Sequence, residues 1–224
     1  ANHSAHRFLS DTYANIPRHE AARVSELLQA QLLQPINVNP VQPHMAVADL
    51  NIITNTGPSN PGFNELAPLM ERSKPQLVAS GIAGNNGTLG NEMVFSKFNE
   101  RTSISLGQFH YETNGFRPNN DQKHNIYNTF IQHAFTSKFN VQAEFRTRET
   151  QQGDIELRFN PDYFFKTVSQ KFNEDIARTG ARYAISPHQD FIVSGMYKNR
   201  NGGPVLQDSV GRLSQKGYQV EAQY

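Results

Sequence analysis

Residues 140–148, Asn-Val-Gln-Ala-Glu-Phe-Arg-Thr-Arg, decide the fold. Successive residues of a β-strand point to opposite faces of a sheet. On that spacing, one face of the segment carries apolar or small side chains and the other carries polar and charged ones. The first set is Val141, Ala143, Phe145 and Thr147, and the second is Asn140, Gln142, Glu144, Arg146 and Arg148. The segment therefore predicts a strand with one apolar and one densely charged face.

The same alternation recurs through the second two-thirds of the chain. It predicts further strands over 76–83, 89–98, 103–116, 125–136, 176–186, 191–198 and 217–224, with a hairpin turn at Gly84-Asn85-Asn86-Gly87. In 103–116 the apolar side chains change parity after Leu106, so we expect a β-bulge near Gly107. A soluble antiparallel sheet would show the same alternation. Charged residues at the polar positions, together with aromatic residues at the strand ends, instead indicate a transmembrane β-barrel with a water-filled interior.

Predicted connections between these strands differ in length. Short turns are expected at 85–88, 99–102, 137–139 and 187–190, and long loops at 117–124, 151–173 and 199–214, with a helical turn at 163–171. Bacterial outer-membrane barrels have short turns on the periplasmic side and long loops outside. The turns at 137–139 and 187–190 are therefore expected to face the periplasm.

The N-terminal third differs from the rest. Residues 1–34 predict a short α-helical hairpin, because apolar residues recur at helical spacing on both sides of Pro17. The hairpin is either one unit of a tetratricopeptide-type solenoid or a helix pair packed on the remaining protein. Residues 35–74 predict a connector rich in Pro, Gly and Asn, and residues 75–224 the antiparallel β-barrel, or part of one.

Composition excludes several classes of protein. The chain has 224 residues, a formal net charge of +1 and no cysteine. Its mean hydropathy is −0.62, and no apolar run approaches the ~20 residues of a spanning helix. The small net charge and the lack of a basic run argue against nucleic-acid binding. The chain opens at Ala1 without a signal segment, so either a signal has been removed or the chain is a piece of a longer protein. We expect a piece, because the first residues resemble the middle of a helical unit.

Four segments carry a resemblance to a known class of protein. They are Pro-Gln-Leu-Val-Ala-Ser-Gly (75–81), Gly-Gln-Phe-His-Tyr-Glu-Thr-Asn-Gly-Phe-Arg (107–117), 140–150 and Ala-Arg-Tyr-Ala-Ile-Ser-Pro-His-Gln-Asp-Phe-Ile (181–192). The chain resembles bacterial outer-membrane proteins that join periplasmic tetratricopeptide repeats to a TonB-receptor-like or porin-like barrel. The resemblance implies a location in the outer membrane with the N-terminal part in the periplasm. It carries no catalytic motif.

Charged residues at polar strand positions are the candidate functional residues. As lumen-lining candidates we identify Glu144, Arg146, Arg148, Arg178, Arg182 and Glu221. One interpretation is a lining that selects solutes by charge and size, with an anion bias that the glutamates partly cancel. The other is a cross-strand salt-bridge ladder that only satisfies buried charges.

Other candidate sites are weaker. His110, His124, His133 and His188 show no metal-ligand spacing, so no metal or cofactor is expected. Neither glycine run has the ending of a phosphate loop. Aromatic residues are interpreted as an interface girdle rather than a sugar-stacking track: Tyr111, Phe116, Tyr127, Phe159, Tyr183, Phe191, Tyr197 and Tyr218.

These observations predict a non-enzymatic outer-membrane channel or export port. Its expected partners are outer-membrane lipid, periplasmic proteins that bind the N-terminal helices, and a polysaccharide or small solute as cargo. Two alternatives stay open. One is a membrane-anchored surface interaction protein, and the other is a soluble β-rich assembly subunit.

Overall fold

A computed structural model gives the structure of the chain. It describes residues 74–155, 160, 162–206 and 209–224, together with 32, 42–43, 53–54, 57–58 and 66–67. The predicted helical hairpin over 1–34 lies outside these residues except for Leu32, and most of the connector over 35–74 also lies outside them. Both stay predictions.

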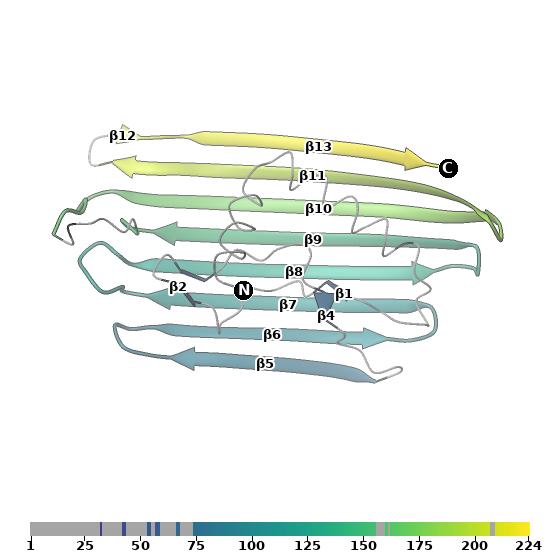
Figure 1. Ribbon diagram of the computed structural model, residues 1–224, viewed down its shortest axis with the longest axis horizontal. Helices are drawn as coiled ribbons and strands as arrows, with labels where there is room; N and C mark the ends of the chain where they lie inside the picture. Colours follow the sequence, from purple (N-terminus) through teal and green to yellow (C-terminus); the bar gives the residue numbers. More distant parts are fainter. Residues whose placement is uncertain are drawn as a thin grey trace.

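The described part of the chain is dominated by one antiparallel sheet (Figure 1). Its strands follow one another across the sheet in sequence order, and β12 and β13 both pair with β11. Among the described residues β5 and β13 do not pair with each other, so the sheet is open rather than closed into a barrel. The strands are β5 Pro75–Ala83, β6 Leu89–Phe98, β7 Thr102–Thr113, β8 Gln122–Ala134, β9 Phe139–Gln152, β10 Ser169–Ser186, β11 Gln189–Leu206, β12 Ser209–Val210 and β13 Leu213–Gln223.

Among the few described residues before β5, four further strands of two residues occur. β1 Gln42–Pro43 pairs with β4 Leu66–Ala67, and β2 Ile53–Thr54 pairs with β3 Gly57–Pro58. Within the described residues, no helix has the length and apolar character needed to cross a membrane.

All eight predicted strands exist, and two are much longer than predicted. β10 and β11 each span 18 residues and pair along nearly their whole length. The predicted loop over 199–214 is therefore wrong, because the Asn-Gly-Gly-Pro run at 201–204 lies inside β11. Gly202 has a φ of 147°, and a Cβ there would lie 2.0 Å from the Lys171 carbonyl oxygen. Glycine lets the backbone of β11 pass this close to β10.

The expected bulge near Gly107 is also wrong. Gly107 pairs with Val94 and with Asn128, and both ladders of β7 run without a register shift. The parity of the apolar residues changes because Phe109 points to the opposite face, where it is buried with Val94 and Ile126. An apolar cluster on that face, rather than an extra residue in the strand, accounts for the pattern.

The predicted helical turn over 163–171 is wrong, because the chain forms an extended loop there that hydrogen-bonds to Asn119 and Asp154. Asn119 Nδ2 donates to the carbonyl oxygens of Phe165 and Val168, at 2.7 and 2.8 Å. The Phe165 amide donates to Asp154 Oδ2 at 2.7 Å. These bonds use backbone groups that a helical turn would need, and from Ser169 onward the chain belongs to β10.

Connections of different length lie at opposite ends of the sheet (Figure 1). One end carries the turns 99–101, 135–138 and 187–188, and we call it the short-turn end. The other carries the loops 114–121 and 153–168, and we call it the loop end. The tight turn at 84–88 also lies at the loop end, because β5 runs towards it.

Candidate functional site

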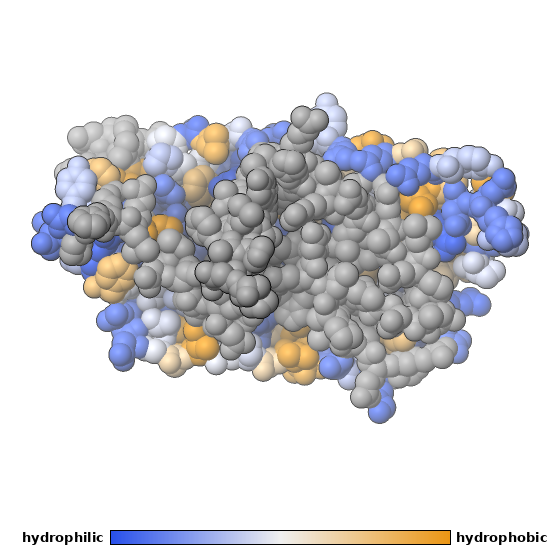
Figure 2. Space-filling model, in the orientation of Figure 1, coloured by the Kyte–Doolittle hydropathy of each residue, from blue (hydrophilic) through white to orange (hydrophobic). Residues whose placement is uncertain are grey.

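The two faces of the sheet have opposite character. On one face, which we call the apolar face, large hydrophobic side chains are exposed to solvent. The exposed fraction of the side chain is 65% for Leu77 and 86% for Tyr218. In the view of Figure 2, hydrophilic residues gather at the two strand ends, and hydrophobic residues are interspersed with hydrophilic ones along the upper and lower margins. The exposed large residues of this face are Leu77, Leu89, Met93, Phe95, Leu106, Tyr127, Ile131, Phe145, Tyr183, Ile185, Phe191, Tyr197, Val205, Tyr218 and Val220.

Aromatic residues form two rows across the apolar face. Near the short-turn end, Phe139 pairs with Tyr183, which pairs with Phe191. Towards the loop end, Ala177 pairs with Phe145 on one side and with Tyr197 on the other, and Tyr197 pairs with Tyr218. The three aromatic residues therefore lie in one row across the strands. Phe139 and Phe145 are six residues apart on β9, about 20 Å along the strand. The positions between these rows carry small or aliphatic residues: Val141, Ala143, Thr179, Ala181, Val193, Gly195, Val220 and Ala222.

The opposite, polar face carries buried charges on β9, β10 and β11. Arg178 pairs in register with Glu144, their side chains form an ion pair, and each side chain is at most 2% exposed. Arg148 Nη2 lies 3.0 Å from Glu174 Oε1, and Lys198 Nζ lies 3.1 Å from Glu174 Oε2. Charges withdrawn from water are tolerated when they are paired in this way.

All six lumen-lining candidates lie on the polar face, although they do not form one cluster. Glu144 and Arg178 meet in the ion pair described above. Arg182 instead binds Asp190, with Nη2 and Nε both 2.9 Å from Oδ1. Glu221 lies on β13 opposite Ser194 and accepts a hydrogen bond from Gln219. Arg146 is 5% exposed, and Arg148 binds Glu174.

Sequence reasoning missed five charged residues of this face: Glu92, Glu174, Asp190, Lys198 and Arg200. Glu174 fell between the predicted loop over 151–173 and the predicted strand over 176–186, Arg200 fell in the predicted loop over 199–214, and Asp190 fell in the predicted turn over 187–190. Glu92 and Lys198 fell in predicted strands but were not identified as candidates. β10 begins earlier than predicted, and β11 begins earlier and ends later. Extending the alternation by two residues, from Ile176 to Glu174, from Ile192 to Asp190 and from Lys198 to Arg200, would have found Glu174, Asp190 and Arg200.

The polar face of β6, β7 and β8 has an apolar cluster at its loop end. Val94, Phe109, Tyr111 and Ile126 are buried together, with Ile82 packed against them. The girdle interpretation of Tyr111 is therefore wrong, because its side chain is buried in this cluster. Phe159 lies outside the described residues.

Several polar atoms near this cluster are buried without a hydrogen-bond partner. Both amide atoms of Asn128, Oε1 of Gln122 and Nε2 of His124 are in this state among the residues that the structure describes. Buried polar groups in proteins nearly always bind protein atoms or water. Water or a polar solute on this face would satisfy them.

No metal site is found within the described part of the chain. In these residues no three His, Asp or Glu side chains come together in a group that could hold an ion. His110 and His133 instead hydrogen-bond to Asn125 and Thr102 on a neighbouring strand.

No protein-family model, curated protein or solved structure matches the chain. Any function must therefore be argued from the two faces of the sheet.

Proposed function

We propose that the sheet forms part of the wall of an outer-membrane β-barrel that acts as a channel or export port. The observation that carries the proposal is the inversion of the two faces. Large hydrophobic side chains such as Tyr218 and Leu77 are exposed, while charged side chains such as Arg178 are buried. Water-soluble proteins rarely expose a contiguous apolar surface of this extent, whereas lipid favours it.

The position of the apolar residues along each strand supports a tilted membrane wall. Phe95 of β6 and Ala177 of β10 lie at one register level. On β6 the apolar residues of this face fall within 89–95, towards the loop end, and on β10 within 177–185, towards the short-turn end. On β8 they fall at an intermediate level, within 127–131. Strands of membrane barrels tilt by about 35–45° relative to the barrel axis. The lipid-facing residues are therefore expected to shift along the strand from one strand to the next, as they do from β6 to β8 to β10.

The aromatic rows bound the apolar positions of β9, β10, β11 and β13 at two levels. Outer-membrane barrels have an apolar band about 25 Å tall, bounded by aromatic residues at both interfaces. The row of Phe139, Tyr183 and Phe191 and the row of Phe145, Tyr197 and Tyr218 enclose the small and aliphatic residues of the apolar face. Long connections lie beyond the second row, which is then the extracellular side.

The polar face supports a role in transport. Its charges are held by cross-strand pairs on β9, β10 and β11. Its unpartnered polar atoms, such as those of Asn128, favour a hydrated interior. A water-filled barrel lined with fixed charges conducts ions and small solutes. The N-terminal segment over 1–34 is then the periplasmic module that binds partner proteins.

Reconstitution into planar lipid bilayers tests this function. The chain, folded in detergent, is expected to migrate differently on a gel before and after heating and to give stepwise conductance when it inserts. The matched control is the same protein heated before reconstitution. A chain that stays monomeric and folded without detergent, and gives no conductance, would contradict the proposal.

A further inference from the structure

The positive charges of the polar face are concentrated on three adjacent strands. On β9, β10 and β11 that face carries six cations, against three anions. The remaining long strands add one anion each on β6 and β13. The excess of cations over anions is therefore confined to β9, β10 and β11. The cations are Arg146, Arg148, Arg178, Arg182, Lys198 and Arg200, and the anions of β9 to β11 are Glu144, Glu174 and Asp190.

Three of the cations surround one carboxylate. Glu174 pairs in register with Arg148 on β9 and with Arg200 on β11. Its two oxygens lie 3.0 Å from Arg148 Nη2 and 3.1 Å from Lys198 Nζ. Arg200 also acts on this carboxylate through its charge. We call Arg148, Lys198 and Arg200 the cationic triplet.

Arg200 is held in place but retains hydrogen-bonding capacity. Its guanidinium lies over the Phe172 ring, 4.6 Å from the ring centroid. A cation stacked on an aromatic ring keeps its N–H groups available at the edge of the guanidinium plane. The buried Nε atom of Arg200 has no hydrogen-bond partner among the described residues.

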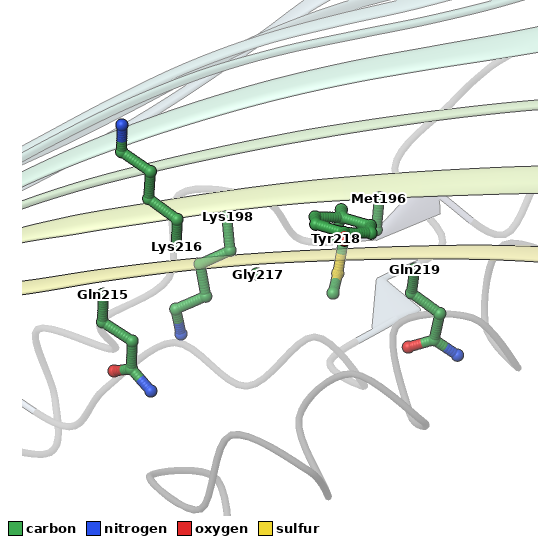
Figure 3. Close-up of a pocket in the computed structure, with 7 residues that line it drawn as sticks. All are labelled: Met196, Lys198, Gln215, Lys216, Gly217, Tyr218 and Gln219. Atoms are coloured by element: carbon green, nitrogen blue, oxygen red, sulfur yellow. The ribbon is translucent and has the colours of Figure 1, made fainter.

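A shallow pocket of about 100 Å³ adjoins the triplet between β11 and β13 (Figure 3). Lys198 lines it together with Gln215 and Gln219, whose amide groups can donate hydrogen bonds. Figure 3 shows these three side chains on one side of β13 and Lys216 on the other. Gln215 also pairs in register with Arg200.

We propose that the cationic triplet and its pocket form a binding station for the oxyanion groups of a solute that moves along the polar face. The inference rests on the proposed function, since it assigns a substrate class to the same face. Guanidinium and ammonium groups around a fixed carboxylate bind phosphate or carboxylate through charge-assisted hydrogen bonds. Glu174 holds the three cations in register and partly offsets their charge, so that an anion can bind and also leave.

Binding of two oxyanion probes by the detergent-folded full chain tests the station. Isothermal titration calorimetry at low ionic strength would use inorganic pyrophosphate as the phosphate probe and trigalacturonate as the carboxylate probe. Lys198→Met and Arg200→Gln are each expected to weaken binding about tenfold, which corresponds to about 1.4 kcal/mol, because each substitution removes a charge-assisted hydrogen bond. The stronger of the two probes identifies the group that the solute carries.

Lys171→Met is the matched control. Lys171 lies on the apolar face at the loop end of β10, and its Nζ lies 2.8 Å from Glu149 Oε1. The substitution thus removes the same charge from a more exposed ion pair on the opposite face, and binding should not change. Heat-modifiable migration of every variant confirms that each one folds.

Two results would overturn the station. Either neither probe binds the protein, or each probe binds the unsubstituted chain and every variant with the same affinity. Because the titration needs no bilayer, it separates the two proposals. A protein that binds pyrophosphate through Lys198 but gives no conductance contradicts the channel and keeps the station. A conducting protein without binding loses only the station.

Discussion

Arg178 and Glu144 face each other in register across β10 and β9 and form an ion pair in which each side chain is at most 2% exposed. The pair lies on the polar face, near the middle of the two longest adjoining ladders. Removal of one partner would leave the other charge buried without its counter-ion. The pair therefore stabilises the registration of β9 against β10, whatever passes along this face.

Arg178→Met is expected to lower the free energy of unfolding by about 3–5 kcal/mol, because it leaves Glu144 charged and buried. The double variant Arg178→Met with Glu144→Leu should recover most of this loss, since two apolar groups replace the pair. Urea unfolding of the detergent-folded protein measures both changes. Arg182→Met is the control. Its partner Asp190 is 29% exposed, so the expected loss is about 1 kcal/mol or less. Equal losses at both arginines would contradict the role of burial.

A charge placed between the two aromatic rows should oppose insertion into lipid. Ala143 lies on the apolar face of β9 between Phe139 and Phe145. Ala143→Arg is expected to cost about 2–4 kcal/mol of folding free energy in vesicles, as for lipid-facing arginine near the bilayer midplane. Asn173→Arg, on the same face but beside Glu149 at the loop end, should cost about 1 kcal/mol or less. Tolerance of both substitutions in vesicles would argue against a lipid-facing surface.

The loops 114–121 and 153–168 are joined through Asp154. Its carboxylate accepts a hydrogen bond from the Phe165 amide and lies 3.7 Å from Arg117 Nη2, and its carbonyl oxygen accepts a hydrogen bond from Asn120 Nδ2 at 2.9 Å. Asp154→Ala should speed hydrogen exchange at the Phe165 amide about 10- to 100-fold, since the lost bonds are charge-assisted. Asp162→Ala, at an exposed position of the same loop, should leave this exchange rate unchanged. Unaltered exchange in Asp154→Ala would show that other contacts hold the loop.

Alternation along strands was predictable from the sequence because it depends only on local geometry. It identified all eight long strands and placed the six candidate residues on one face, as for Arg146 and Arg148 on β9. The ends of the strands were harder to predict. The run at 201–204 has the composition of a turn, yet it is a strand because β10 and β13 supply its partners. Such pairing between distant segments overrides local propensity.

The partners of the charged residues could not be predicted. Arg148 binds Glu174 and Arg182 binds Asp190, and both pairs depend on the register between strands. The reversal at Phe109 was misinterpreted for a similar reason, because the buried cluster with Val94 and Ile126 is formed by three strands. The predicted helices over 1–34 are not tested, since they lie outside the described residues.

The central claim is that hydrocarbon contacts the apolar face, and spin labels test it most directly. Because the chain has no cysteine, single cysteines can be introduced without a background. Ala143→Cys reports the apolar face and Ser194→Cys the polar face. In lipid vesicles, a label at position 143 should be relaxed by oxygen and shielded from a water-soluble nickel complex, and a label at 194 should show the reverse. A label at 143 that the nickel complex reaches as readily as at 194 would contradict the account.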